Sequence, residues 1–146
     1  MQKTINNNLR FTTDIAEALD NASVIFLALP TPTKTFGYQQ DKAYDLSCTE
    51  VGIRSIVKFY NQNGMKNDVV IVEKSTVPIG TYEMLITLIN ANSIEENKKR
   101  YTIASNPEFL AEGTAVNDLL KPDRVILGSQ KGANIDRLTH LFKFVG

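Results

Sequence analysis

The chain has 146 residues, of which 42% are hydrophobic and 22% charged, which is the composition of an ordinary globular domain with a core. Sixteen basic and sixteen acidic residues cancel, and this balance argues against a nucleic-acid or anionic-membrane surface. No apolar run approaches the roughly 18 residues of a membrane span. From the charge balance and the short apolar runs together, we expect neither nucleic acid nor a membrane as partner.

The cysteine and histidine content limits the chemistry further. Cys48 is the one cysteine, so an internal disulfide is excluded, and a reducing, cytoplasmic location is expected. One cysteine and one histidine also argue against a zinc site built from this chain, and we expect no metal. Residues 1–10 are polar and Asn-rich and carry no signal-peptide core.

The first half of the chain alternates helix and strand patterns. The spacing predicts a short helix over residues 14–21, followed by a buried strand in the continuous apolar run Val24 to Leu29. The polar connection from Thr31 to Tyr44 is long, and loops of this length inside a compact domain are often functional. Residues 47–50 have capping-box spacing, and the apolar residues behind them predict a helix that ends near Asn63-Gly64.

The same alternation continues after residue 64. Val69 to Val72 is the second predicted strand, and Pro78 then stands where the first turn of a helix accepts proline. That helix would turn Tyr82, Leu85, Ile86 and Ile89 inward, and the charged run Glu95 to Arg100 after it is expected to be a solvated loop.

Two further strands and a helix complete the pattern. Tyr101 to Ser105 is the third predicted strand, Val125 to Leu127 is the fourth, and apolar spacing from Ile135 to Val145 predicts a terminal helix. Because strands and helices alternate, we expect an α/β fold with a mainly parallel sheet, right-handed crossovers and flanking helices.

Three of the predicted strands end in polar segments of unusual composition. These segments are Pro30 to Lys34, Lys74 to Pro78, and Asn106 to Glu108. Parallel strands bring such segments to one edge of the sheet, which is where ligands bind in open α/β sheets. One binding crevice therefore explains all three.

The first two segments offer groups that suit a nucleotide. Thr31, Thr33, Ser75 and Thr76 carry hydroxyls, and backbone amides near Val77 at a helix start can meet partial negative charge. The alternative interpretations are turn formation for the Thr-Pro-Thr run and helix capping for Ser75-Thr76, and capping is compatible with ligand binding.

The third segment carries candidate acid–base groups. Pro107 ends the strand, and Glu108 and Glu112 then flank Phe109 and Leu110. A carboxylate beside large apolar side chains can be partly desolvated and act as a general acid or base. The alternative is a solvated turn before a helix whose N-terminus favours glutamate.

Two phosphate-binding motifs are missing. The chain contains neither Gly-x-Gly-x-x-Gly nor a Walker-type Gly-Lys-Ser/Thr, so the pyrophosphate cradle of a dinucleotide fold is not in it. Either the ligand is held differently, or the chain starts after that part.

Four segments in order resemble one enzyme family. They are TPTKTFG (31–37), EKSTVP (73–78), NPEFLAEGTA (106–115) and PDRVILG (122–128). The chain from about Leu9 onward is similar to the UDP-glucose 6-dehydrogenase family in its animal-type form. Related GDP-mannose and UDP-N-acetylmannosamine dehydrogenases share the NPE core, whereas FLAEG favours the glucose enzyme.

The resemblance implies an NAD-dependent enzyme that oxidises UDP-glucose to UDP-glucuronate with two NAD and a water. A cysteine traps the aldehyde formed first, the second oxidation gives a thioester, and water releases the acid. The complete enzyme would be a homo-oligomer, with a hexamer expected. Cys48 does not correspond to the family's nucleophile, which would lie beyond Gly146.

The resemblance also implies roles for matching residues. Glu108 would be the acid–base of thioester hydrolysis, and Thr76 would orient a water. NAD would contact Leu29, Pro30, Thr31, Pro32, Thr33, Ser75, Thr76, Val77 and Glu112. The UDP-sugar would be held by Glu108, Phe109, Leu110, Ala111 and Glu112. Asp123 and Arg124 are interpreted as structural.

The departures from the family are large. Residues 1–146 would form the second half of an NAD-binding domain with an incomplete doubly wound, Rossmann-like sheet. The family's N-terminal Gly-rich strand–helix unit and its C-terminal UDP-sugar domain would be absent, so we expect the isolated chain to be inactive. Pro30 stands where the animal-type motif has Asn, which removes one side-chain contact.

Two other functions are compatible with these residues. One is a non-catalytic nucleotide-binding or regulatory module that associates with a full-length dehydrogenase, which co-purification would reveal. The other is an unrelated α/β nucleotide-binding protein that acquired similar loops.

Overall fold

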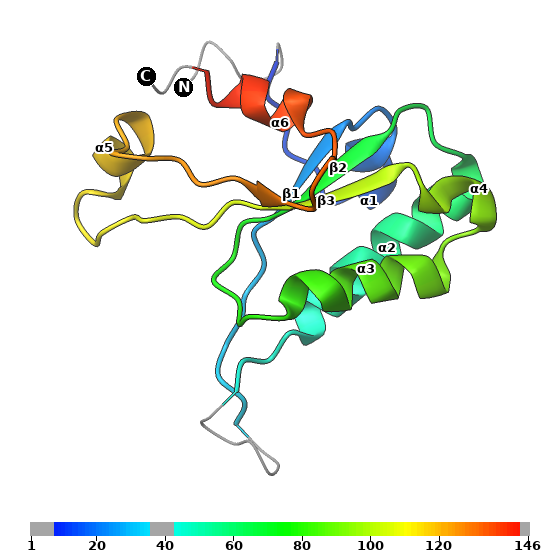
Figure 1. Cartoon of the computed structure of the whole chain (residues 1–146), viewed down its shortest axis with the longest axis horizontal. Helices are drawn as coiled ribbons and strands as arrows, with labels where there is room; N and C mark the ends of the chain where they lie inside the picture. Colours follow the sequence, from blue (N-terminus) through cyan, green and yellow to red (C-terminus); the bar gives the residue numbers. More distant parts are fainter. Residues whose placement is uncertain (1–7, 36–42, 144–146) are drawn as a thin grey trace.

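Two parallel strands, β2 (Val69–Glu73) and β3 (Tyr101–Ser105), form the centre of the sheet in this computed structural model (Figure 1). β1 (Val24–Leu27) pairs in parallel with β2, and β4 (Gly128–Ser129) pairs antiparallel with β3, so the order is β1-β2-β3-β4. The structure describes residues 8–35 and 43–143. The predicted α/β class with a mainly parallel sheet is confirmed.

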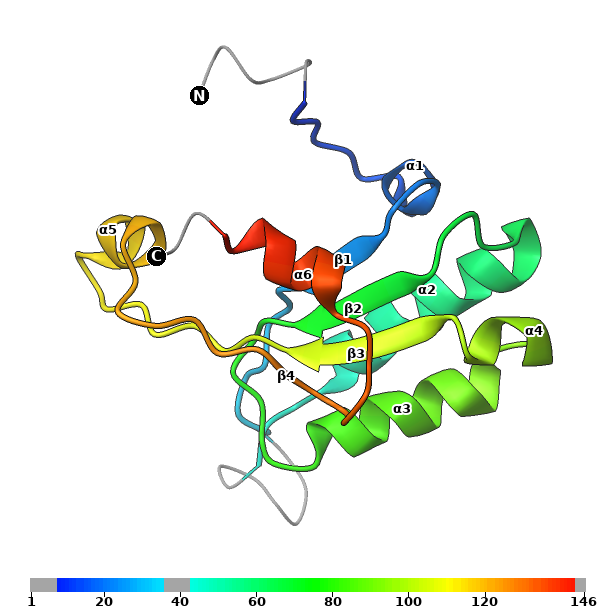
Figure 2. The same ribbon diagram turned by 45° about the horizontal axis from the view of Figure 1, so that its top comes forward.

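One face of the sheet is covered by two long helices. α2 (Ser47–Asn63) and α3 (Thr81–Asn92) lie side by side against it, and both views show them on the same side (Figures 1 and 2). Because successive strand residues point to opposite faces, alternate residues of β2 meet these helices. The buried apolar side chains of this larger core are Leu19, Leu27, Ile53, Ile56, Val57, Tyr60, Met65, Val69, Ile71, Leu85, Ile89 and Ile103.

The opposite face packs against α6 (Asp136–Leu141), as Figure 2 shows. Val70 and Val72 of β2 meet Ala104 and Leu138 there in a second, smaller cluster. Every residue of β2 is buried, because both faces of the strand are covered. This explains its uninterrupted apolar sequence.

The first two helices differ from prediction at their starts. α1 (Ile15–Leu19) is shorter than expected, and Asp14 caps it by accepting a hydrogen bond from the Ala16 amide (2.8 Å). The capping box predicted at residues 47–50 is wrong: Ser47 lies inside α2, and its amide donates to Asp45 Oδ1 (2.9 Å). The predicted end at Gly64 is confirmed, with φ of +75°.

Two predictions around α3 are also wrong. The helix begins at Thr81 rather than at Pro78, because Gly80 has φ of +93° and interrupts the helical path between them. The charged run after α3 contains a helical turn, α4 (Glu95–Lys98), in which Asn97 is buried and its side-chain amide donates to the Tyr60 carbonyl (3.2 Å). The side-chain bond gives this segment structure that its charge does not suggest.

The fourth strand was predicted at the wrong residues. β4 occupies Gly128–Ser129, whereas the apolar run at 125–127 lies before it. The carbonyl of Ile126 accepts a hydrogen bond from the Asn106 side chain and not from the backbone of a neighbouring strand. Leu127 packs into the cluster beneath α6. Residues 36–42 of the long connection, and Val145 of the predicted terminal helix, lie outside the described residues.

Candidate functional site

The carboxyl ends of three strands lie level with one another. Leu27 of β1 pairs in register with Glu73 of β2, and Glu73 pairs with Ser105 of β3. The three polar segments therefore leave the sheet at one edge, as parallel strands require. This confirms the predicted convergence.

Hydrogen bonds join the first two segments. The Ser75 hydroxyl accepts a bond from the Leu29 amide (2.9 Å) and donates to the Leu29 carbonyl (2.8 Å). The Thr31 hydroxyl donates to the Thr76 carbonyl (2.9 Å). These contacts fix the turn after β1 against the segment after β2.

The second and third segments meet at Glu108. The Thr76 hydroxyl donates to Glu108 Oε1 (3.3 Å), and the Lys74 ammonium lies 3.9 Å from Glu108 Oε2. The two charged side chains are only 24% and 32% exposed, so the ion pair is largely shielded from water. Glu108 thus meets two groups of the segment that follows β2, and its acid–base role stays a prediction.

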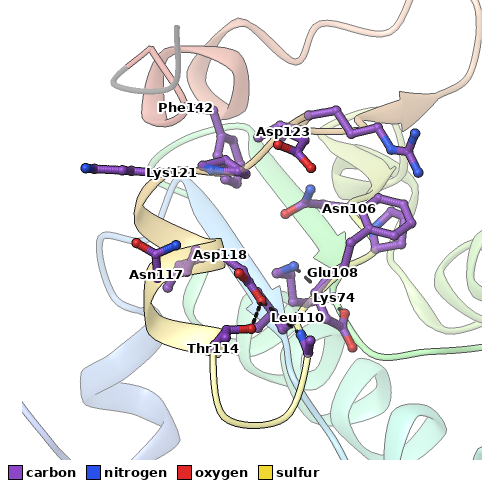
Figure 3. Close-up of a pocket in the computed structure, with 17 residues that line it drawn as sticks. Lys74, Asn106, Glu108, Leu110, Thr114, Asn117, Asp118, Lys121, Asp123 and Phe142 are labelled. Atoms are coloured by element: carbon purple, nitrogen blue, oxygen red, sulfur yellow. Dashed lines mark hydrogen bonds and ion pairs between the residues drawn. The ribbon is translucent and has the colours of Figure 1, made fainter.

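Two cavities border this group. One, of about 420 Å³, lies at the ends of β1 and β2 and is lined by Ala28, Leu29, Thr31, Lys74, Ser75, Thr76, Glu108 and Leu110. The other, of about 470 Å³, lies between the segment after β3, α5 (Ala115–Leu120) and residues 121–125 (Figure 3). Lys74, Glu108 and Leu110 line both cavities, so Glu108 stands at their boundary.

Burial shifts the ionisation of two neighbouring groups. Glu73 is 5% exposed, and burial raises its pKa, although the hydrogen bond from the Ser75 amide opposes the rise. The negative charge of Glu108 raises the pKa of Glu73 further. Burial lowers the pKa of the Lys74 ammonium, and Glu108 partly offsets this. Both effects follow from desolvation, which disfavours whichever form carries charge.

Asn106 anchors the segment after β3. It is 2% exposed, its backbone amide donates to the Glu73 carbonyl (3.0 Å), and its Nδ2 donates to the Ile126 carbonyl (2.9 Å). Its Oδ1 is buried and accepts no hydrogen bond within the described residues. Sequence reasoning missed this anchoring role, because an Asn before Pro looks like an ordinary turn residue.

Two contacts hold the rest of that segment. Asp118 Oδ2 accepts bonds from the Ala111 amide (3.0 Å) and the Thr114 hydroxyl (2.8 Å), and Figure 3 shows the second bond. These bonds lower the pKa of Asp118. The Arg124 guanidinium lies 5.0 Å from the centre of the Phe109 ring, a cation–π distance. This contact agrees with the structural interpretation of Arg124.

Five other predicted site residues belong to the described part of the chain but line neither of these two cavities: Pro30, Pro32, Thr33, Val77 and Glu112. Thr33 forms an isolated bridge with Tyr44, and Val77 lines a separate cavity of about 250 Å³ beside α3. Glu112 is exposed in the turn before α5. Their assigned ligand contacts stay predictions.

No three His, Cys, Asp or Glu side chains within 8–35 and 43–143 are grouped so that they could hold a metal ion. In the same part of the chain, every helix is too short or too polar to cross a membrane.

The sequence matches one family model over nearly its whole length. The model describes the NAD binding domain of the UDP-glucose/GDP-mannose dehydrogenase family and matches residues 1–145.

Curated relatives cover most of this chain. UDP-glucose 6-dehydrogenase of Drosophila melanogaster is 43% identical over 131 residues, which is 90% of this chain and 26% of the relative. UDP-glucose 6-dehydrogenase 3 of Oryza sativa is 43% identical over 138 residues, which is 94% of this chain and 27% of the relative. The chain therefore spans about a quarter of the length of these relatives.

Solved structures show the same fold. A UDP-glucose dehydrogenase from the archaeon Pyrobaculum islandicum superposes with a TM-score of 0.71 at 29% identity, over 92% of this chain and 28% of that one. A ternary complex of GDP-mannose dehydrogenase from Pseudomonas aeruginosa superposes with a TM-score of 0.74 at 26% identity, over 92% of this chain and 29% of that one.

Proposed function

We propose a function from the premise that this chain belongs to the UDP-glucose/GDP-mannose dehydrogenase family, whose NAD-binding domain it matches. NAD is the cofactor of that domain. The fly and rice relatives are UDP-glucose 6-dehydrogenases, and we assign the same activity here: oxidation of UDP-glucose to UDP-glucuronate with two NAD and one water.

The cavity at the ends of β1 and β2 suits the nicotinamide end of NAD. Leu29 and Leu110 offer apolar surface, and the hydroxyls of Thr31 and Thr76 offer polar atoms at its edge. A few polar groups on an apolar wall is the usual character of a cofactor site. When bound, NAD accepts the hydride, and these side chains orient it and exclude water.

The second cavity suits the nucleotide sugar. Lys74 and Lys121 line it and can meet the diphosphate charge, while Asp118 and Glu108 can meet sugar hydroxyls. The two cavities share Glu108, so a sugar in one and a nicotinamide in the other would meet beside its carboxylate.

Glu108 is the proposed general acid–base, and its position between the two cavities is the observation that carries this proposal. Its Oε1 accepts from the Thr76 hydroxyl, and in this proposal Thr76 orients a water for the final hydrolysis. Glu108 would take a proton from that water as it attacks, and the Lys74 ammonium would stabilise the carboxylate beforehand.

The remaining parts of the active site are proposed to lie outside these 146 residues. A nucleophilic cysteine, a pyrophosphate-binding turn and a UDP-sugar domain complete the enzyme in this proposal, so the isolated chain is inactive. The complete protein is proposed to act as a homo-oligomer, a hexamer, in the cytoplasm.

A chimera tests the assignment. The segment of the Drosophila enzyme that matches this chain would be replaced by the chain itself, and NAD reduction would be measured with UDP-glucose and with GDP-mannose. We expect activity with UDP-glucose only. Glu108→Gln should lower kcat by about 10²-fold or more, because it removes an acid–base group.

Glu96→Gln is the matched control, since Glu96 is exposed on α4, and it should leave kcat unchanged. Full activity of the Glu108→Gln chimera would refute the acid–base role, and preference for GDP-mannose would refute the sugar. An inactive chimera, together with binding of the isolated chain to a whole dehydrogenase, would favour a regulatory module.

A further inference from the structure

Leu29 is held from two directions at the start of the turn after β1. This residue lines the 420 Å³ cavity, and its side chain packs against the larger core beneath α2 and α3. A shift of this one residue would therefore change the shape of the cavity wall without unfolding the sheet.

The backbone of Leu29 is fixed by one hydroxyl. Ser75 Oγ accepts from the Leu29 amide (2.9 Å) and lies 2.8 Å from the Leu29 carbonyl and 3.4 Å from that of Leu27. A hydroxyl has a single hydrogen, and the shorter contact takes it. Ser75 is itself fixed, because its amide donates to Glu73 Oε1 (3.0 Å). The Ser75 hydroxyl therefore has no hydrogen left to donate to a ligand.

A glycine leaves room for the side chain of Leu29. A Cβ added at Gly52, inside α2, would lie 2.9 Å from Leu29 Cδ1, a separation that real Cβ atoms essentially never show. Glycine is disfavoured relative to alanine inside a helix. Its presence here is explained by the room that Leu29 needs.

We propose that Gly52 and Ser75 are positioning residues that together hold Leu29 and thereby set the shape of the NAD cavity on its β1 side. The inference rests on the proposed NAD site, and it assigns Ser75 an effect on the cofactor that passes through Leu29. We call the set Gly52, Ser75 and Leu29 the Leu29 clamp.

The clamp is first tested without ligand, by hydrogen exchange of the residue-29 amide and by the residue-29 methyl signals in NMR spectra. Ser75→Ala should speed exchange about tenfold, since it removes the acceptor of that amide. Gly52→Ala should displace the Leu29 methyl signals and also speed exchange.

Adding Leu29→Val, which deletes Cδ1, separates the two variants. It should restore slow amide exchange in Gly52→Ala but not in Ser75→Ala, because a smaller side chain cannot replace a hydroxyl. Ser55→Ala in α2 is the control and should change none of these signals. Unchanged Leu29 signals in Gly52→Ala, or rescue of both variants by Leu29→Val, would overturn the clamp.

The second test titrates with NAD the fly-enzyme chimeras that carry the same substitutions, because the pyrophosphate-binding turn is proposed to lie outside these 146 residues. Gly52→Ala should weaken NAD binding about tenfold, as small misplacements at a site do, with a melting temperature equal to or above that of the wild type. Leu29→Val should recover most of that loss in Gly52→Ala. Equal NAD affinity in Gly52→Ala and wild type would overturn the role in cofactor binding. Should no chimera bind NAD while the exchange pattern holds, the proposed NAD site fails and the clamp stands.

Discussion

The ammonium of Lys74 lies 3.9 Å from the carboxylate of Glu108, and both side chains are less than one-third exposed. Lys74 follows β2 and Glu108 follows β3, so the contact joins two segments that are far apart in sequence. Burial lowers the pKa of Lys74, and the charge of Glu108 acts in the opposite direction. The ionisation of Lys74 therefore depends on the charge of Glu108.

This relationship predicts the effect of neutralising the acid. Glu108→Gln should lower the pKa of Lys74 further below its ordinary value of 10.5, because desolvation then acts without an opposing negative charge. The measurement is an NMR titration of the Lys74 side chain between neutral and alkaline pH. Glu96→Gln is the control, and an unchanged Lys74 pKa in Glu108→Gln would contradict the ion pair.

Glu73 gives a prediction for stability against pH. Its pKa is raised above 4.5, so the folded state binds this proton more tightly than the unfolded state does. The contribution of Glu73 to the free energy of unfolding is therefore largest at low pH and falls as the pH rises from about 4.5 through the folded pKa. Glu73→Gln removes this titration.

Urea denaturation of both proteins from pH 4 to pH 7 tests the sign. The free energy of unfolding of Glu73→Gln, relative to the wild type, should increase with pH. Glu112 is exposed, so the free energy of unfolding of Glu112→Gln should change with pH as that of the wild type does. A difference that is constant or decreases with pH would contradict the burial of this carboxyl group.

The elements that the sequence predicts well are those whose pattern reports burial directly. β2 and β3 are continuous or nearly continuous apolar runs, and they lie where predicted because strands covered on both faces have no polar alternation. Their parallel pairing then brings Thr76 and Glu108 together, so the meeting of the three loops could be predicted from topology alone.

The failures arise where long-range contacts decide. The run Val125 to Leu127 is as apolar as a strand, but Asn106, some twenty residues earlier, binds the Ile126 carbonyl, and pairing with β3 starts only at Gly128. Similarly, nothing in the local sequence shows that Lys74 faces Glu108 or that Leu29 packs on Gly52. Such contacts follow from packing, which periodicity does not report.

Asn106 provides a third prediction. Asn106→Asp should lower the free energy of unfolding at pH 7 by about 3 kcal/mol or more, because a carboxylate would face the Ile126 carbonyl in a buried position. Acidification should restore part of the loss, since a protonated Asp can donate to that carbonyl. Asn117 is exposed on α5 and lines the same 470 Å³ cavity as Asn106. The free energy of unfolding of Asn117→Asp should stay within about 0.5 kcal/mol of the wild-type value.

Chemical denaturation at pH 7 and pH 4 separates these variants. If Asn106→Asp were as stable as Asn117→Asp at pH 7, the buried bond to Ile126 would not exist in solution. A loss that persists unchanged at low pH would mean that shape, and not charge, causes it.

The last prediction concerns α5, which buries none of its residues and stands apart from the sheet in Figure 1. Val116 and Leu120 are 74% and 62% exposed and lie four residues apart, so they share one helix face. An apolar face open to water favours self-association, and sedimentation velocity of the isolated chain should show oligomers that increase with concentration. Val116→Lys with Leu120→Glu should shift the chain to monomer, with the free energy of unfolding changed by no more than about 0.5 kcal/mol. Leu138→Glu, which places a charge in the smaller core, should instead unfold the chain. A wild-type chain that stays monomeric at high concentration would contradict the prediction for α5.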